Sequence, residues 1–223
     1  MTNRPQRGKI TSTPAGDLPR WVRDEIMHTA PKARRDPALI ELSNGIDAFA
    51  SERYGKASHH LEKAKDLAPQ AATIRELLGL SYYENGQWQK ALQELRTFRR
   101  IAGDPMHMPV EMDSLRALEK DRDIENTWDR FRKLDAPRAV QDEARVVYGS
   151  YLLEKGRIRE AWKVADPGRL VSSPAESTVR RWYVAARIAL AANDHQSARK
   201  LIKAIAAHDE DFPGLLELRA QLG

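Results

Sequence analysis

The residues most able to hold a metal ion in this chain are its six histidines, and they form no metal-binding pattern. A metal site on one helix needs ligands on one face, as in a His-Glu-x-x-His motif. The one close pair in the sequence is His59 and His60, and adjacent residues of a helix point about 100° apart. The sequence therefore predicts no metal site, and it offers no cofactor-binding motif.

Nucleophiles and phosphate-binding loops are equally hard to find. The chain has no cysteine, which excludes thiol catalysis and disulfides. The segment Gly149-Ser150-Tyr151 lacks the second glycine of the Gly-x-Ser-x-Gly motif that carries a serine nucleophile. We therefore predict a non-catalytic protein, because an enzyme site would have to be assembled from residues that are distant in the sequence.

One segment near the C-terminus places cations beside aromatic rings. It contains Arg180, Arg181 and Arg187 together with Trp182 and Tyr183. Arginine interleaved with aromatic residues can stack on nucleic-acid bases or contact acidic peptides. In the other interpretation, the tryptophan belongs to the core and the arginines to a solvated helix face. The sequence leaves both interpretations open.

The net charge of +5 is concentrated at the N-terminus. Residues 1–37 carry eight Lys/Arg and four Asp/Glu, whereas residues 38–223 carry 29 and 28. Residues 1–16 are polar and show no apolar periodicity, which predicts a disordered basic arm that a polyanion would meet first. Residues 17–37 are predicted to form a short amphipathic helix followed by a basic linker. The apolar side of this helix is formed by Trp21, Val22, Ile26 and Met27.

The elements that must position these residues are indicated by an internal repeat. Residues 38–69 recur at an offset of 34 residues. At this offset Gly45 falls on Gly79, Tyr54 on Trp88, Ala57 on Ala91 and Leu61 on Leu95. Apolar residues at i, i+3 and i+4 predict two helices in each copy, with glycine where they approach most closely. A period of 20 to 50 residues is typical of solenoids, in which neighbouring helix pairs bury one another's apolar faces.

This pattern resembles the tetratricopeptide repeat (TPR), a pair of antiparallel helices with a period of 34 residues. The residues that carry the resemblance are Gly79, Tyr82 and Ala91 in the second copy and Gly45, Ala57, Ala64 and Pro69 in the first. Arg75 stands where the family pattern has tryptophan. The wider arrangement resembles an uncharacterised actinobacterial group with a basic N-terminal arm.

The resemblance implies an all-α fold. We expect a right-handed superhelix of about five helix pairs over residues 38–223, with a capping helix at residues 212–222. The unit at residues 105–134 is degenerate, because Asp113 replaces the small residue at its eighth position. We therefore expect the two helices of this third pair to pack more loosely than those of its neighbours.

The resemblance also implies a concave groove lined by the first helix of each pair. The residues it assigns to this groove are Leu39, Leu42, Ile46, Phe49, Glu76, Leu80, Tyr83, Arg180, Tyr183 and Arg187. The first four form an apolar row, which a protein in water rarely leaves exposed. Either the helix within residues 17–30 caps this row, or a partner helix docks on it. The sequence leaves both alternatives open.

The function predicted from the resemblance is a scaffold or adaptor that binds a protein or peptide partner in the groove. The alternative is an RNA- or ribosome-associated protein that uses the basic arm and the arginine–aromatic segment. The sequence contains no apolar run long enough to span a bilayer and no secretion signal at its start. We therefore expect a cytoplasmic protein, whose oligomeric state the sequence leaves open.

Overall fold

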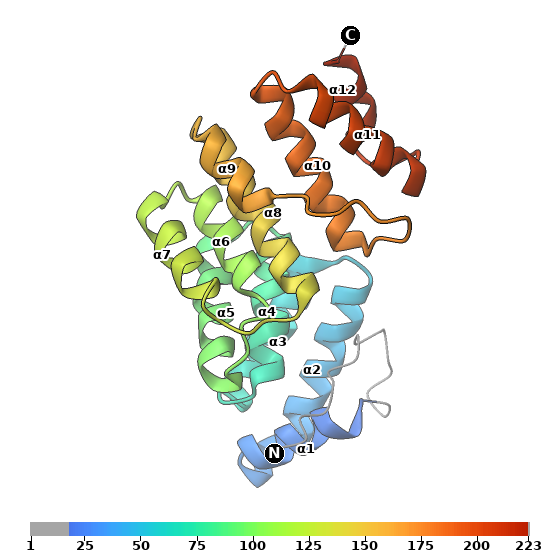
Figure 1. Ribbon diagram of the computed structural model, residues 1–223. Helices are drawn as coiled ribbons and strands as arrows, with labels where there is room; N and C mark the ends of the chain where they lie inside the picture. Colours follow the sequence, from blue (N-terminus) through green and yellow to red (C-terminus); the bar gives the residue numbers. More distant parts are fainter. Residues whose placement is uncertain (1–17, 223) are drawn as a thin grey trace. The chain divides into compact units, whose positions relative to one another are not determined.

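A computed structural model describes residues 18–222, and the predicted basic arm at residues 1–16 lies outside the described residues. In residues 18–222 the regular structure consists of twelve α-helices and one short 3-10 helix, without strands. This confirms the all-α prediction. The chain divides into two compact units, Met1–Asp104 and Pro105–Gly223, so the predicted repeat domain of residues 38–223 spans parts of both (Figure 1).

Unit 1 consists of a short N-terminal helix and two helix pairs. Its elements are α1 (Arg20–Thr29), the 3-10 helix η1 (Lys32–Arg34), α2 (Arg35–Ala50), α3 (Tyr54–Leu67), α4 (Ala72–Glu84) and α5 (Trp88–Ala102). The pairs α2–α3 and α4–α5 are joined by short turns, and α3 packs on α4 so that the pairs share one core. Helix α1 packs on α2.

Unit 2 contains three helix pairs and a final short helix. Its elements are α6 (Met108–Ala117), α7 (Asp121–Phe131), α8 (Arg138–Glu154), α9 (Ile158–Ala165), α10 (Glu176–Ala191), α11 (His195–His208) and α12 (Leu215–Ala220). The first helices α6, α8 and α10 pack in succession, and α12 packs on α10 and α11. The described residues thus contain five helix pairs followed by a C-terminal helix.

Glycine permits the close helix approach that the repeat predicts. A Cβ atom added to Gly45 would lie 2.7 Å from Cγ of Leu61, and one added to Gly79 would lie 2.7 Å from Cγ of Leu95. Both distances are far shorter than real carbon–carbon contacts. Leu61 and Leu95 are fully buried, so the second helix of each pair fits its leucine against the bare backbone of the first.

The third pair, α6–α7, is built differently. These helices are short, and they meet over less of their length than α2–α3 or α4–α5. Asp113 binds Arg116 of the same helix, with 2.7 Å between Oδ1 and a guanidinium nitrogen. The expected looser packing is therefore observed where a carboxylate replaces the small residue.

Arg75, which departs from the family pattern, takes part in a buried polar network. Its guanidinium donates to the carbonyl of Pro69 (3.0 Å) and to Glu94 of α5 (2.6 Å). Glu94 is only 3% exposed, and Lys65 of α3 also pairs with it at 3.2 Å. A buried carboxylate needs such compensation. The network thereby connects α3, α4 and α5 across the two helix pairs.

The network continues from Lys65 to Glu62, which accepts a hydrogen bond of 2.5 Å from the hydroxyl of Tyr82. Burial tends to raise the pKa of Glu62, but the hydrogen bonds from Lys65 and Tyr82 outweigh it and hold this pKa below its usual value. Burial and the adjacent carboxylate raise the pKa of Tyr82. The phenol therefore stays protonated and donates to an ionised glutamate.

The close approach at Gly79 can be tested by Gly79→Ala. Alanine favours a helix by about 1 kcal/mol over glycine, but here its methyl group would meet Leu95, including the backbone nitrogen at 3.2 Å. We expect a net loss of roughly 1–2 kcal/mol in the free energy of unfolding, measured by urea titration. Gly55→Ala is the matched control, since nothing lies within 4 Å of its added Cβ. Equal effects of the two substitutions would contradict the packing argument.

The Arg75–Glu94 pair can be tested by a double-mutant cycle. Arg75→Met leaves Glu94 buried with one cation fewer, so we expect a loss of roughly 2–4 kcal/mol in the free energy of unfolding. Arg75→Met combined with Glu94→Met should recover most of this loss, because Lys65 keeps Glu62 as its partner. If the losses of the two single variants simply add, the residues are not coupled.

Candidate partner-binding surfaces

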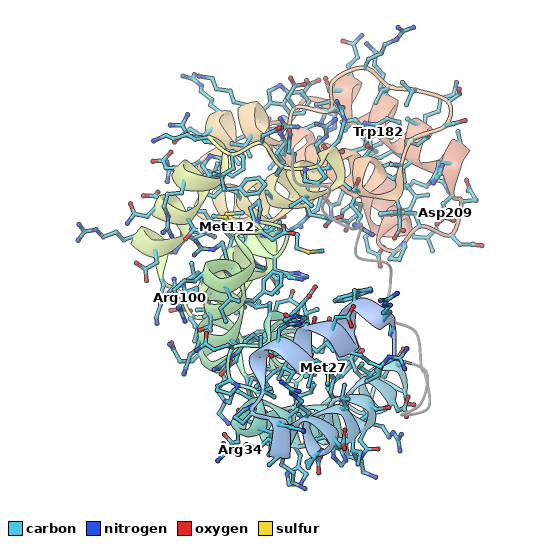
Figure 2. All side chains as sticks on the ribbon, turned by 90° about the horizontal axis from the view of Figure 1, so that it is seen from below. Met27, Arg34, Arg100, Met112, Trp182 and Asp209 are labelled. Carbon is cyan, nitrogen blue, oxygen red and sulfur yellow. The ribbon has the colours of Figure 1, made fainter. Side chains whose placement is uncertain are left out.

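The apolar row predicted on α2 is covered by the chain's own N-terminal helix. Leu42 and Ile46 are 0% and 2% exposed, and the other two residues of the row are half-buried. They belong to the same hydrophobic cluster as Val22 and Ile26 of α1, which are fully buried. Figure 2 shows α1 lying across the helices of unit 1. Of the two alternatives left open by the sequence, the structure thus shows the first: α1 covers the apolar row, where a partner helix would otherwise dock.

A carboxylate of α1 also caps the first turn of α4. Glu25 accepts hydrogen bonds from the backbone N–H groups of Ala72 (2.7 Å) and Thr73 (3.3 Å). The first N–H groups of a helix have no partner within the helix, and they carry the positive end of its dipole. The residue before α4 is Ala71, which has no side chain that could cap. Glu25, from 47 residues earlier in the chain, takes that role.

The predicted groove residues of α4 share one face of their helix. Glu76, Leu80 and Tyr83 lie four and three residues apart and are all half-buried. The ring of Tyr83 meets Trp88 edge-on at a centroid distance of 5.3 Å. On α4, these three residues of the predicted groove therefore remain partly accessible to solvent.

The three groove residues predicted on α10 have separate environments. The guanidinium of Arg180 donates to Glu143 of α8 (2.8 Å) and to Glu176 (2.5 Å). Burial tends to lower the pKa of Arg180, but these two carboxylates raise it above its usual value. Arg180 is therefore neutralised within unit 2, and it is less available to a partner than the sequence predicted.

Tyr183 and Arg187 do come together, and they line a hollow of about 470 Å³ in unit 2. We call it the Tyr183–Arg187 hollow. Its other lining residues come from α8, α10, the turn after α10, the start of α11, and α12 with its C-cap. They are Leu153, Leu190, Ala191, Asn193, His195, Glu217, Leu218 and Gln221. The ring of Tyr183 packs closely against Gly214. It also contacts Phe212, with 5.5 Å between the two ring centroids.

The predicted arginine–aromatic patch is not a single surface. Trp182 is fully buried, and its indole N–H donates to the carbonyl of Pro167 at 3.2 Å. Figure 2 labels it among the helices of unit 2. Arg181 is 4% exposed, donates to the same carbonyl and pairs with Asp142 at 3.2 Å. These two side chains belong to the core, so they cannot stack on bases or meet a peptide.

A comparison with protein families finds a match over most of the first two helix pairs. The family model described as "Tetratricopeptide repeat" matches residues 42–105. Residues 42–105 are thus similar to this family, over less than a third of the chain. A search of curated proteins found no match to the chain. Tetratricopeptide repeats generally mediate protein–protein interaction, and the family typically consists of non-catalytic scaffolds.

The matched segment, residues 42–105, contains most of the groove residues predicted in unit 1, whereas the Tyr183–Arg187 hollow lies beyond it. Sequence reasoning also missed a second hollow in unit 2, which lies between α7, α8 and α9 and is lined by Trp128 and Tyr148. The available signal was the degenerate third unit, because loosely paired helices leave space beside them.

In residues 18–222 no three His, Asp or Glu side chains are grouped so that they could hold one ion. His60 instead binds Glu41, with 2.7 Å between Nδ1 and Oε2. Across the same residues, no helix combines the length and apolar character needed to cross a membrane.

The cap formed by Glu25 can be tested by Glu25→Ala. The substitution frees the N–H groups at the start of α4, so we expect the free energy of unfolding to fall by about 1 kcal/mol. Asp24→Ala is the control, because among the described residues the Asp24 side chain forms an exposed ion pair with Arg20, at 3.7 Å, and caps no helix. Thermal unfolding followed by circular dichroism would measure both. A larger loss with Asp24→Ala would argue against the cap.

Proposed function

We propose that this protein is a non-catalytic scaffold or adaptor that binds a polypeptide partner through the first helices of its helix pairs. The observation that carries the proposal is Arg187 in the Tyr183–Arg187 hollow. Arg187 is half-buried, and no acidic group in residues 18–222 lies within ion-pair distance of it. Glu217 lines the same hollow but forms no ion pair with Arg187. A partly buried cation without a directly paired carboxylate is stabilised by a ligand that supplies one.

The other residues of the hollow suit a peptide. Its walls include Leu153, Leu190 and Leu218, and its rim carries the amides of Asn193 and Gln221. Amides can pair with the N–H and carbonyl groups of a peptide backbone, while leucines accept an apolar side chain. The hollow also holds the carboxylate of Glu217, which would repel a phosphate backbone.

The alternative, RNA or ribosome association, has less support from the described residues. Two of the five residues in the predicted arginine–aromatic patch are buried, and Arg180 is paired with carboxylates. What remains of that alternative is the basic arm, which lies outside the described residues.

The proposal predicts a partner whose capture depends on the hollow. Affinity capture with the full chain, followed by mass spectrometry, should recover a polypeptide that survives nuclease treatment. Arg187→Glu should weaken its binding about tenfold or more, because it reverses the charge in the hollow. Arg199→Glu is the matched control, since this exposed cation lies on α11 outside the hollow.

Two outcomes would contradict the proposal. One is capture that nuclease abolishes and that falls steeply with added salt, as expected for a nucleic-acid ligand. The other is capture that Arg187→Glu and Arg199→Glu weaken equally, which would indicate non-specific attraction to a basic protein.

A further inference from the structure

The second hollow of unit 2 lies between α7, α8 and α9 and measures about 740 Å³. We call it the α7–α9 cleft. It shares no residue with the Tyr183–Arg187 hollow. One face of α8 forms its back wall, through residues that recur every three or four positions: Gln141, Arg145, Tyr148 and Leu152.

The cleft is open because α7 does not lie closely along α8. Helix α7 packs on α6 and touches α8 far less than α3 touches α4 in unit 1. The linker of residues 132–137 is two residues longer than the corresponding linker of residues 68–71. Leu134 of this linker lines the cleft and is 46% exposed, so an apolar side chain stands at its edge.

Aromatic rings form the floor of the cleft. Trp128 of α7 stacks on Tyr148 of α8, with a centroid distance of 4.7 Å and an interplanar angle of 13°. Phe131 lies next to the tryptophan at 6.3 Å. Burial and the charge of Glu125 raise the pKa of Tyr148 to about 12, so its phenol stays neutral. Trp128 itself is only half-buried.

Several charges around the cleft are already paired with one another. Arg157 pairs with Glu125 of α7 and with Glu160 of α9. Arg132 pairs with Asp129 of α7 at 2.8 Å. Each carboxylate of the lining thus has a cationic partner, but Glu125 and Glu160 share the single guanidinium of Arg157. The lining as a whole holds four cations and three carboxylates, an excess of one positive charge.

Two cations of the cleft are left without a carboxylate of their own. Arg145 lies 3.6 Å from Asp142, but that buried carboxylate is closer to Arg181, at 3.2 Å, and its other oxygen accepts a hydrogen bond from Thr178. One carboxylate therefore serves two guanidinium groups. Burial lowers the pKa of Arg181, and the charge of Arg145 acts in the same direction. Within the described chain, exposed Lys163 has no acidic group at ion-pair distance. The hydrogen bond from Arg157 lowers the pKa of Glu160, and the more distant charge of Lys163 acts in the same direction.

We propose that the α7–α9 cleft is a second docking site, for an acidic segment of a partner polypeptide. A carboxylate of the segment sits at Arg145 and Lys163, and a neighbouring aromatic or aliphatic side chain packs against Trp128 and Leu134. The carboxylate complements the excess positive charge of the lining at Arg145 and Lys163, and the apolar anchor covers the half-buried indole and the exposed leucine. This site is independent of the Tyr183–Arg187 hollow.

A peptide fits these observations better than a nucleic acid does. Besides its cations, the lining of the cleft contains the carboxylates of Glu125, Asp129 and Glu160. A nucleic-acid strand carries a charge at every nucleotide and would place phosphates against these carboxylates. A peptide can instead place a single carboxylate where the two cations lie.

The test uses two blocked tripeptides, acetyl-Glu-Phe-Glu-amide and its neutral analogue acetyl-Gln-Phe-Gln-amide, added to the full chain at millimolar concentration. Nuclear magnetic resonance follows the indole N–H signal of Trp128, which Trp128→Phe identifies by its loss. The acidic peptide should shift this signal and leave those of Trp21 and Trp88 in unit 1 unchanged. Arg145→Gln should weaken binding about fivefold, as expected for one charge-assisted contact.

Controls separate this site from other effects. Arg159→Gln removes an exposed cation of α9 that does not line the cleft, and it should leave binding unchanged. Arg187→Ala should also leave it unchanged, which distinguishes a failure here from a failure of the proposed function. If Arg145→Gln lowers the melting temperature, Lys163→Gln at an exposed position replaces it and should weaken binding about twofold.

The proposal is overturned if the acidic peptide does not shift the Trp128 signal or if the neutral peptide shifts it equally. It is also overturned if Arg145→Gln folds normally and binds as well as the native chain. A shift produced at lower concentration by a single-stranded oligouridylate would instead assign the cleft to nucleic acid.

Discussion

The structure of unit 1 depends on the contact between a glycine of one helix and a leucine of the next. Gly45 and Gly79 each admit a leucine side chain to the backbone surface of their helix. This contact sets the distance between the two helices of a pair, and the distance determines which apolar side chains meet. Since a single helix pair cannot bury its own apolar face, the pairs must then stack. Gly149 of α8 approaches Ala165 of α9 in the same way in unit 2, with 3.2 Å between its added Cβ and the alanine Cβ.

Where the repeat keeps these contacts, the sequence predicts the fold well. Glycine and leucine at a fixed offset are local signals, and helix formation depends on residues three and four positions apart. The looser third pair was predictable for the same reason, because Asp113 stands where a small residue is needed. The buried Trp182 follows one of the two interpretations that the sequence left open.

The features of the candidate sites that sequence reasoning missed arise from contacts between residues far apart in the chain. Nothing near Arg181 in the sequence indicates that Asp142 is its partner. Both interpretations of the sequence therefore placed Arg181 in solvent, and its burial shows that both were wrong for this residue. In the sequence Arg75 is a departure from the repeat pattern. In the structure its charge is paired with the carboxylate of Glu94 on the next helix. The α7–α9 cleft follows from a helix that packs poorly on its successor, and periodicity alone does not describe how helices of different pairs meet.

Helix α1 has a consequence for how unit 1 gains its structure. In a regular helical-repeat protein each repeat interacts only with its immediate neighbours, so stability is close to a sum of local terms. Here α1 packs on α2 of the first pair, while its Glu25 holds the start of the second. This ten-residue helix therefore contacts both repeats, which would otherwise interact only where α3 packs on α4. Unit 1 should accordingly melt as one cooperative block rather than fray repeat by repeat from its N-terminal end.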